Sequence, residues 1–388
     1  MMRMNFKKQE KKPVRKLTYA EQILTSALPD AVAKFPAEGQ ILVAGNRSGW
    51  LVLELLKKTS LFITAHAFDA HHARAIATHL IEGGERKGLV EQVVRCTPQV
   101  GGPYCRAFFM TTPRSMPAEL VLDQLQDIHQ SLIEGGELWA AFEGDPDDAL
   151  KTLRLVWKTV HVVKKEKHAI LFRAVKKGEP VKTRSFTSDW EASVPGGGKI
   201  TFTSLPGCFC HRRPDMGGLS LAEVAAAEIE KISALPVDDS GVKTPYSILD
   251  MGCGCGLVGL LAADAFRRTH PSETFKLTLI DSHARAIAAA QLNAARIGIE
   301  PEYILADDGL PRGRVGEYDL FVGNPPYYSE YKIAEIFLET AYRALKPGGI
   351  CLSVVKTATG LLPVQEKYFQ TAEIIHRRGY CVLRSIRL

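Results

Sequence analysis

Short apolar runs that end at a polar residue recur through the second half of the chain. The run at 248–249 ends at Asp250, and the run at 277–280 ends at Asp281. Apolar residues at helical spacing follow the first of these runs, in the segment 257–261. Buried strands that alternate with amphipathic helices predict an α/β domain built on a parallel sheet.

A glycine-rich turn separates the first of these strands from its helix. Gly252, Gly254 and Gly256 have the spacing Gly-x-Gly-x-Gly, which lets backbone N–H groups approach a ligand at a helix N-terminus where side chains would block it. Several nucleotide-binding families share this signal. Asp281 lies about 30 residues after Asp250, the position at which a carboxylate accepts hydrogen bonds from the hydroxyls of a ribose.

The most specific motif of the chain is Asn324-Pro325-Pro326-Tyr327, which follows a predicted strand at 318–323. With the glycine turn, it resembles the motif of class I S-adenosylmethionine-dependent methyltransferases that methylate an amino group conjugated to a ring or a carbonyl. Standing alone, the tetrapeptide is also typical of a simple turn after a strand. The upstream glycine turn and carboxylate favour the methyltransferase interpretation.

The residue types of this motif are suited to holding an exocyclic amine of a base, which is a poor nucleophile. The lone pair of such an amine is delocalised into the ring, so an enzyme must hold the nitrogen where it becomes tetrahedral as the methyl group arrives. We expect the Asn324 side-chain oxygen and the Pro325 carbonyl to accept the two N–H groups, which leaves the lone pair aimed at the methyl group. Tyr327 is expected to stack on a flipped base.

The resemblance implies S-adenosylmethionine as the cofactor and gives each strand end a role. Asp281 holds the ribose, and Asp307, at the end of a third predicted strand, accepts from the adenine amine. Asp250 is either structural or contacts the cofactor through water. The cofactor-binding residues implied for this half are Asp250, Gly252, Gly254, Gly256, Asp281, Asp307 and Asn324.

The segment before the glycine turn resembles one methyltransferase family in particular. Phe-Thr-Ser-Leu-Pro-Gly-Cys-Phe at 202–209 and Asp-Met-Gly-Gly at 215–218 are similar to a segment of the bacterial ribosomal RNA small subunit methyltransferase C family, which modifies the N2 amine of a guanine in 16S rRNA. Close relatives act in the same way on 23S rRNA. The resemblance implies that Gly207 and Phe209 line the methionine end of the cofactor, with Asp215 as a further candidate.

The first half of the chain repeats features of the second half. The letters at 72–77, His-Ala-Arg-Ala-Ile-Ala, return 211 residues later at 283–288, and two other segments repeat at offsets of 212 and 213. Chance similarity of two alanine-rich helices explains the letters but not the shared spacing, so the pattern predicts an internal duplication. Thr112 stands where Asn324 stands, and the first turn, 45–48, lacks the middle glycine. The first copy is therefore predicted not to bind S-adenosylmethionine.

Length and duplication together predict two domains in this chain of 388 residues. The expected fold class is α/β, with two tandem Rossmann-like class I methyltransferase domains of which the N-terminal one is degenerate. Residues 1–17 are expected to form a disordered basic tail, 18–190 the degenerate domain and 191–388 the catalytic domain.

Composition adds few constraints. A net charge of +6 and a pI near 8.8 are compatible with an acidic polymer as partner but do not require one. No apolar run approaches the length of a membrane helix, so a cytoplasmic protein without a membrane partner is expected. The eight cysteines are expected to be reduced thiols. Neither Cys208-x-Cys210 nor Cys253-x-Cys255 has the spacing of a zinc knuckle, so no metal is expected.

Basic segments leave two interpretations open. The tail before residue 17 either contacts RNA phosphates or aids solubility. The segment 158–184, which includes a predicted hairpin, either contacts phosphates or is a solvated edge that discourages strand pairing. The segment 208–213, which carries the basic residues 211–213, either faces the substrate or is a solvated loop.

The sequence therefore predicts methylation of the N2 amine of a guanine in ribosomal RNA, with 16S rRNA favoured and a ribosomal subunit as an alternative form of the partner. The predicted catalytic residues are Asn324, Pro325 and Tyr327. Alternatives are methylation of adenine N6 or of a glutamine amide in a release factor, and a catalytically silent RNA-binding or ribosome-assembly factor. Tyr328 stands where the family usually has a histidine, so any role of that histidine is in doubt here.

Overall fold

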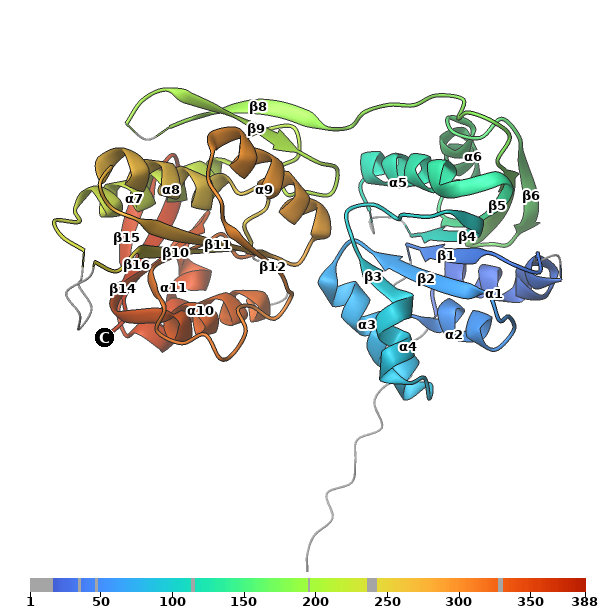
Figure 1. Cartoon of the computed structure of the whole chain (residues 1–388), viewed down its shortest axis with the longest axis horizontal. Helices are drawn as coiled ribbons and strands as arrows, with labels where there is room; N and C mark the ends of the chain where they lie inside the picture. The colour runs from blue at the N-terminus through green and yellow to red at the C-terminus, as the bar shows by residue number, and fades with distance from the viewer. Residues whose placement is uncertain are drawn as a thin grey trace, which may run out of the picture.

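The computed structural model describes residues 17–33, 36–45, 48–112, 116–194, 196–235, 243–326 and 331–388. Residues 1–16 of the predicted tail lie outside this part of the chain, as do Tyr327 and Tyr328. Two α/β halves lie side by side, and a β-hairpin runs along the C-terminal half, joined to the N-terminal half by a connecting segment (Figure 1). Its strands are β8 (Ser188–Ser193) and β9 (Lys199–Ser204).

The N-terminal half is a seven-stranded sheet with a buried apolar core on each face. The strands are parallel except β7, which runs antiparallel to both of its neighbours. In spatial order they are β3 (Val94–Cys96), β2 (Phe62–Ala67), β1 (Gln40–Ala44), β4 (Tyr104–Thr111), β5 (Leu132–Glu143), β7 (Ala169–Val175) and β6 (Val160–Lys165). The helices are α1 (Tyr19–Val32), α2 (Trp50–Leu56), α3 (Ala70–Glu82), α4 (Lys87–Val93), α5 (Ala118–Ser131) and α6 (Pro146–Arg154).

The C-terminal half has a second seven-stranded sheet with the same order of strands. Here β16 is the antiparallel strand, paired with β14 and β15. In spatial order the strands are β12 (Glu302–Leu305), β11 (Phe275–Asp281), β10 (Tyr246–Met251), β13 (Tyr318–Gly323), β14 (Leu345–Val355), β16 (Tyr380–Ile386) and β15 (Glu373–Arg377). The helices are α7 (Met216–Glu230), α8 (Leu257–Thr269), α9 (Ala284–Ile297), α10 (Lys332–Ala344) and α11 (Ala358–Phe369).

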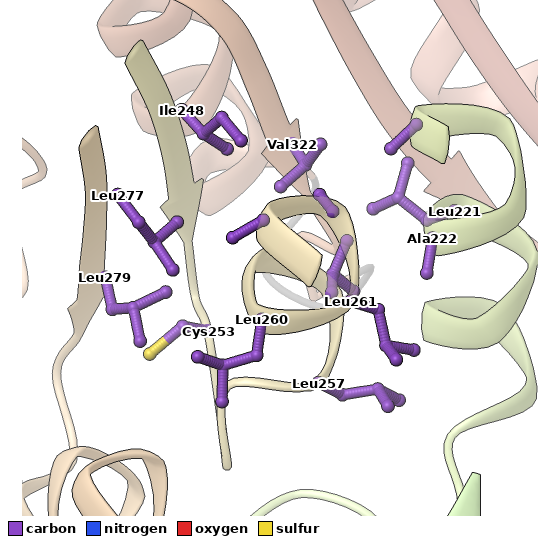
Figure 2. Close-up of a cluster of buried hydrophobic side chains, with 14 of the residues drawn as sticks. Leu221, Ala222, Ile248, Cys253, Leu257, Leu260, Leu261, Leu277, Leu279 and Val322 are labelled. Atoms are coloured by element: carbon purple, nitrogen blue, oxygen red, sulfur yellow. The ribbon is translucent and has the colours of Figure 1, made fainter. Parts of the chain in front are cut away.

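Helix α8 packs between the second sheet and α7 (Figure 2). Leu257, Leu260 and Leu261 recur at helical spacing and are buried with Ile248 of β10 in one apolar cluster. Gly256 caps the helix in the left-handed conformation, with φ of 83°. Because the apolar face of α8 is held against the sheet, the glycine turn that precedes it is held at the end of β10.

The strand registers show which residue of the N-terminal half corresponds to Asn324, and they correct the prediction from the sequence. Phe109 pairs with the last residue of β1, and Gly323 pairs with the last residue of β10. The residue after Phe109 therefore has the position of Asn324. That residue is Met110, and not Thr112 as the sequence offsets predicted.

The repeated letters at 72–77 are also out of register, by three residues. Helix α3 begins at Ala70, so His72 lies inside the helix, whereas His283 is the N-cap of α9. Residues three apart share a helix face. Two alanine-rich helices can therefore match in letters without occupying equivalent positions.

The two halves contact each other through equivalent turns, one after β2 and the other after β11. Ala70 N donates to Ser282 O at 2.7 Å, and Ala284 N donates to Phe68 O at 2.7 Å. An isolated antiparallel β-bridge lies between these two bonds. The contact is reciprocal, like the isologous interface of a symmetric dimer.

Arg285 is a buried cation at this interface, with 4% of its surface exposed. Its guanidinium pairs with Asp123 of α5, and its Nε donates to Pro98 O at 3.1 Å. It also lies over the Phe68 ring, 4.3 Å from the centroid. One side chain of the C-terminal half thus joins three segments of the N-terminal half.

We expect Arg285→Ala to lower the free energy of unfolding by about 2–4 kcal/mol, because it removes the cation of a buried ion pair. Denaturant unfolding of the full chain, followed by tryptophan fluorescence, measures the change. Arg296→Ala on the same helix is the control. The Arg296 side chain is 39% exposed, so its loss should cost under about 0.5 kcal/mol. Equal losses for the two variants would contradict the role of Arg285.

Candidate active site

The glycine turn presents backbone at the carboxyl end of β10. Gly252, Gly254 and Gly256 have φ of 70°, 55° and 83°, a region in which residues with a Cβ are strained. Gly252 N and Cys253 N both donate to Ile280 O, at 2.8 and 2.9 Å. A Cβ built on Gly254 would meet no described atom within 4 Å. The middle glycine therefore faces open space.

The Asp281 carboxylate holds this turn from the end of β11. Its Oδ2 accepts from Gly254 N at 2.9 Å, and its Oδ1 accepts from His283 N at 2.8 Å. Burial raises the pKa of Asp281 to about 6, although the backbone donors lower it. Because a carboxylate has about four acceptor positions, Asp281 can accept further hydrogen bonds from a ligand beside Gly254.

Asp250 points into the protein. It is 2% exposed, and its Oδ2 accepts from Gly259 N in the first turn of α8 at 2.7 Å. Burial, with a smaller contribution from the charge of Asp281, raises the pKa of Asp250 to about 7. Of the two roles predicted for Asp250, this geometry favours the structural one.

Asn324 lies at the same sheet edge, because β13 is the neighbour of β10 and Gly323 pairs with Met251. Asn324 Nδ2 donates to Asp215 Oδ2 at 2.7 Å. An ionised carboxylate only accepts hydrogen bonds, so the NH₂ group of the amide must face Asp215 and Oδ1 is its accepting end. Pro325 follows directly and is buried.

Asp215 is a site residue that the sequence offered only as a further candidate. It is the N-cap of α7, where its Oδ1 accepts from Gly217 N at 3.0 Å, and its other oxygen accepts from Asn324. Burial raises the pKa of Asp215, and the hydrogen bonds from backbone and Asn324 lower it. An aspartate just before a predicted helix is an N-cap signal, but its bond to Asn324 depends on the tertiary fold.

Asp307 contacts the N-terminal half. Arg74 Nη2 lies 2.5 Å from Asp307 Oδ2, and His71 Nδ1 lies 3.2 Å from the same oxygen. Arg74 Nη1 also donates to Asp308 at 2.8 Å. Asp307 follows Ala306, whose N donates to the carbonyl of Asp281 at 3.0 Å. Sequence reasoning missed both contacts from the N-terminal half, although Arg74 lies within the repeated segment.

The remaining predicted residues are Gly207, Phe209 and Tyr327. Gly207 lies against the ring of His283, where a Cβ would be 2.8 Å from Cε1. Phe209 is 72% exposed. The structure therefore brings together the glycine turn, Asp281 and Asn324, and leaves Phe209 in solvent. The predicted stacking residue Tyr327 lies outside the described residues.

All eight cysteines are free thiols, as predicted. Within the described ranges, no three or more His, Cys, Asp or Glu side chains are grouped so that they could hold a metal ion. No helix in that part of the chain is long and apolar enough to cross a membrane.

Comparison with known proteins defines the class of protein. Residues 199–384 match the family model of the Methyltransferase small domain. A solved structure from T. thermophilus, described as a 16S rRNA N2 methyltransferase in complex with AdoMet and guanosine, is similar with a TM-score of 0.69. It is 20% identical and covers 92% of this chain and 91% of that chain. This likeness confirms the predicted class I methyltransferase fold.

Curated relatives carry a more particular name. The chain is 32% identical to Ribosomal RNA small subunit methyltransferase C of Pseudomonas paraeruginosa, over 44% of this chain and 46% of that protein. The protein of the same name from Pseudomonas entomophila is 30% identical over 49% of this chain and 52% of its own length. The chain thus spans about half the length of the curated relatives it matches. Over that part, the predicted resemblance to this family is confirmed.

The raised pKa of Asp250 predicts a pH dependence of stability. Between pH 4 and 7 the folded state keeps a proton that the unfolded state, with a pKa near 3.8, has released. The free energy of unfolding therefore falls as pH rises, by at most about 1.4 kcal/mol per pH unit from this group.

Asp250→Asn should remove this contribution, because an amide oxygen can still accept from Gly259 without titrating. Urea unfolding from pH 5 to 7.5 should show a shallower pH slope for the variant than for the parent. Asp148→Asn, which changes a carboxyl with 76% of its side chain exposed, is the control and should keep the parental slope. An unchanged slope in Asp250→Asn would contradict the assignment.

Proposed function

We propose that the chain transfers the methyl group of S-adenosylmethionine to the exocyclic N2 amine of a guanine in 16S ribosomal RNA. The observation that carries this proposal is the position of Asn324, whose oriented amide lies at the sheet edge that also holds the open turn at Gly254. The names of the curated relatives and of the T. thermophilus structure support the choice of substrate. Ribosomal RNA, free or within a subunit, is then the partner.

The residues at the sheet edge fit this cofactor. Gly252, Gly254 and Gly256 offer backbone to its methionine portion, and the open space at Gly254 leaves room for it. Asp281 would accept from the ribose hydroxyls, and Asp307 from the adenine amine. Gly207 and Phe209 remain proposed for the methionine end, which Phe209 reaches only if its exposed ring turns inward. When bound, S-adenosylmethionine supplies an activated methyl group on a sulfonium centre.

The substrate amine is positioned by acceptors. Asn324 Oδ1 and the Pro325 carbonyl accept its two N–H groups, so that the nitrogen lone pair points toward the cofactor side of the site. Asp215 acts through Asn324, because its carboxylate decides which end of the amide faces the substrate. Tyr327 is proposed to stack on the guanine. No base with a shifted pKa is required, since the methylated, ammonium-like nitrogen loses its proton readily.

The N-terminal half is proposed to be a degenerate copy that arose by duplication. The identical strand order and the reciprocal contact between equivalent turns support this origin. Its turn lacks the middle glycine, and it has Met110 in place of Asn324, so it does not carry the methyl transfer. The hairpin pairs Ser188 with Ser204, which favours a boundary before Ser188, slightly earlier than the predicted division at 190–191.

Methyl transfer can be tested directly with radiolabelled S-adenosylmethionine. We expect label to appear as N2-methylguanine in 16S rRNA, presented as naked RNA or as undermethylated 30S subunits. Asn324→Ala should lower the rate at least about 100-fold, because it removes an acceptor that holds the reacting amine. Circular dichroism and thermal unfolding of the variant should match those of the parent, which separates lost chemistry from lost folding.

Parallel substrates decide between the alternatives. Label in 50S subunits would move the assignment to 23S rRNA, and label only in DNA or in release factor would overturn the guanine assignment. Cofactor binding without transfer to any substrate would favour a silent RNA-binding factor.

A matched glycine pair tests the cofactor site. Gly254 and Gly298 have φ of 55° and 66°, and a Cβ on either meets no described atom within 4 Å. Both alanine variants should therefore lose a similar stability, about 1–2 kcal/mol. Only Gly254→Ala places a methyl group in the proposed cofactor space, so it alone should weaken S-adenosylmethionine binding, at least about tenfold. Calorimetric titration measures this, and equal affinities in both variants would place the cofactor elsewhere.

A further inference from the structure

The edge of the second sheet at which β13 ends carries a row of polar side chains. Strands β13, β14, β16 and β15 lie next to one another in that order. Each of them gives one residue to the apolar cluster under α7: Val322, Val354, Val382 and Ile375. Residues two apart in a strand point to the same face of a sheet. Two residues nearer the edge, the same face therefore presents Asn324, Lys356, Tyr380 and Arg377.

Side-chain contacts connect this row to the candidate active site. Lys356 Nζ lies over the Tyr380 ring, 4.3 Å from its centroid. The same ring lies against Gly217, where a Cβ would be 3.3 Å from Tyr380 Cε1. Gly217 N donates to Asp215, whose other carboxylate oxygen accepts from Asn324. The aromatic ring in the middle of the row is therefore close to the amide that is proposed to hold the reacting amine.

Arg377 lies at the far end of the row, on a turn that α7 holds in place. It pairs with Tyr380 in the ladder between β15 and β16. Its carbonyl accepts from Ser220 Oγ at 3.2 Å, and the next residue, Arg378, forms an ion pair with Glu223 at 2.6 Å. The backbone of the turn is thus fixed, while the side chain of Arg377 is exposed.

The two cations of the row are not neutralised by the protein. Lys356 contacts the Tyr380 ring, and Arg377 Nη1 donates to the carbonyl of His376 at 3.1 Å. Neither pairs with a carboxylate among the described residues. Neighbouring strands lie about 4.8 Å apart, so two strand spacings separate the two cations by about 10 Å. Exposed positive charges arranged in this way attract a polymer with repeated negative charges.

The corresponding edge of the first half carries the opposite charge. The strand registers give Glu143 the position of Lys356 and Glu166 the position of Arg377. Glu143 accepts from the backbone of α1 at 3.0 Å, and Glu166 pairs with Lys164 at 2.8 Å. The fold therefore does not require cations at these two positions, and the half that lacks an asparagine at the position of Asn324 also lacks them.

We propose that Lys356 and Arg377, with Tyr380 between them, form a docking surface for the sugar–phosphate backbone of the RNA strand that carries the target guanine. The two cations contact phosphates of nucleotides next to that guanine, and the Tyr380 ring holds the Lys356 ammonium in place. The inference rests on the proposed function, because it describes how the substrate of that site is held. Phosphate contacts position a strand and do not read its sequence.

The salt dependence of RNA binding tests this surface. The probe is a fluorescently labelled single-stranded RNA oligonucleotide with one guanine, and anisotropy on the full chain with S-adenosylhomocysteine measures its affinity. Each phosphate contact adds about 0.7 to the slope of log K against log salt, so Lys356→Gln/Arg377→Gln should reduce the slope by about 1.4. At 0.1 M salt the variant should bind about 10–30-fold more weakly.

A second double variant changes the same two charges at the opposite edge of the sheet. Lys276 lies at the start of β11, and Arg312 lies in the loop before β13; both are exposed. Lys276→Gln/Arg312→Gln should keep the parental slope. The exchange Lys356→Arg/Arg377→Lys keeps both charges and should also keep it, and circular dichroism checks the fold of all three variants. Equal slopes for the two glutamine variants overturn the proposal.

The other outcomes separate this surface from the proposed methyl transfer. If the parent methylates ribosomal RNA and the slope of Lys356→Gln/Arg377→Gln is unchanged, the surface is wrong and the proposed function stands. If the slope falls but no guanine is methylated in any substrate, the proposed function is wrong and the phosphate contacts stand. Weaker binding to intact 30S subunits without weaker binding to the oligonucleotide would assign the row to an acidic segment of a ribosomal protein and overturn the RNA assignment.

Discussion

The bond from Gly254 N to the Asp281 carboxylate is the contact on which the candidate site depends. It connects the middle of the glycine turn to the end of the neighbouring strand, and the other oxygen of Asp281 holds the start of α9. The turn after β11 is also the segment that meets the N-terminal half. One carboxylate thus links the turn, the helix and the interface, so a ligand that bonds to Asp281 acts on all three.

The local features of this site could be predicted from the sequence. Closely spaced glycines and apolar runs that end in aspartate are patterns of neighbouring residues. These patterns predicted the turn and the strands, and the motif after the strand at 318–323 predicted the position of Asn324. The sequence leaves the role of Asp250 open, because that role depends on burial against α8. The bond between Asp215 and Asn324 joins residues far apart in the chain, and no local pattern contains it.

The residue correspondence between the two halves shows a different limit of prediction from sequence. An offset read from repeated letters is insensitive to a slip of three residues in a helix, because such a slip keeps the apolar face. Strand pairing does not tolerate a slip in this way, since each residue has a defined partner. The register therefore decided that Met110, and not Thr112, has the position of Asn324.

The reciprocal contact between the halves uses backbone N–H and C=O groups, with side chains added around it. Every residue other than proline supplies both groups, so substitutions at these turns leave the two bonds in place. Because both turns belong to one chain, they also meet at a high effective concentration whatever the amount of protein. A joint of this kind imposes little selection on side chains, so the residues of either half can change while the geometry of the pair persists.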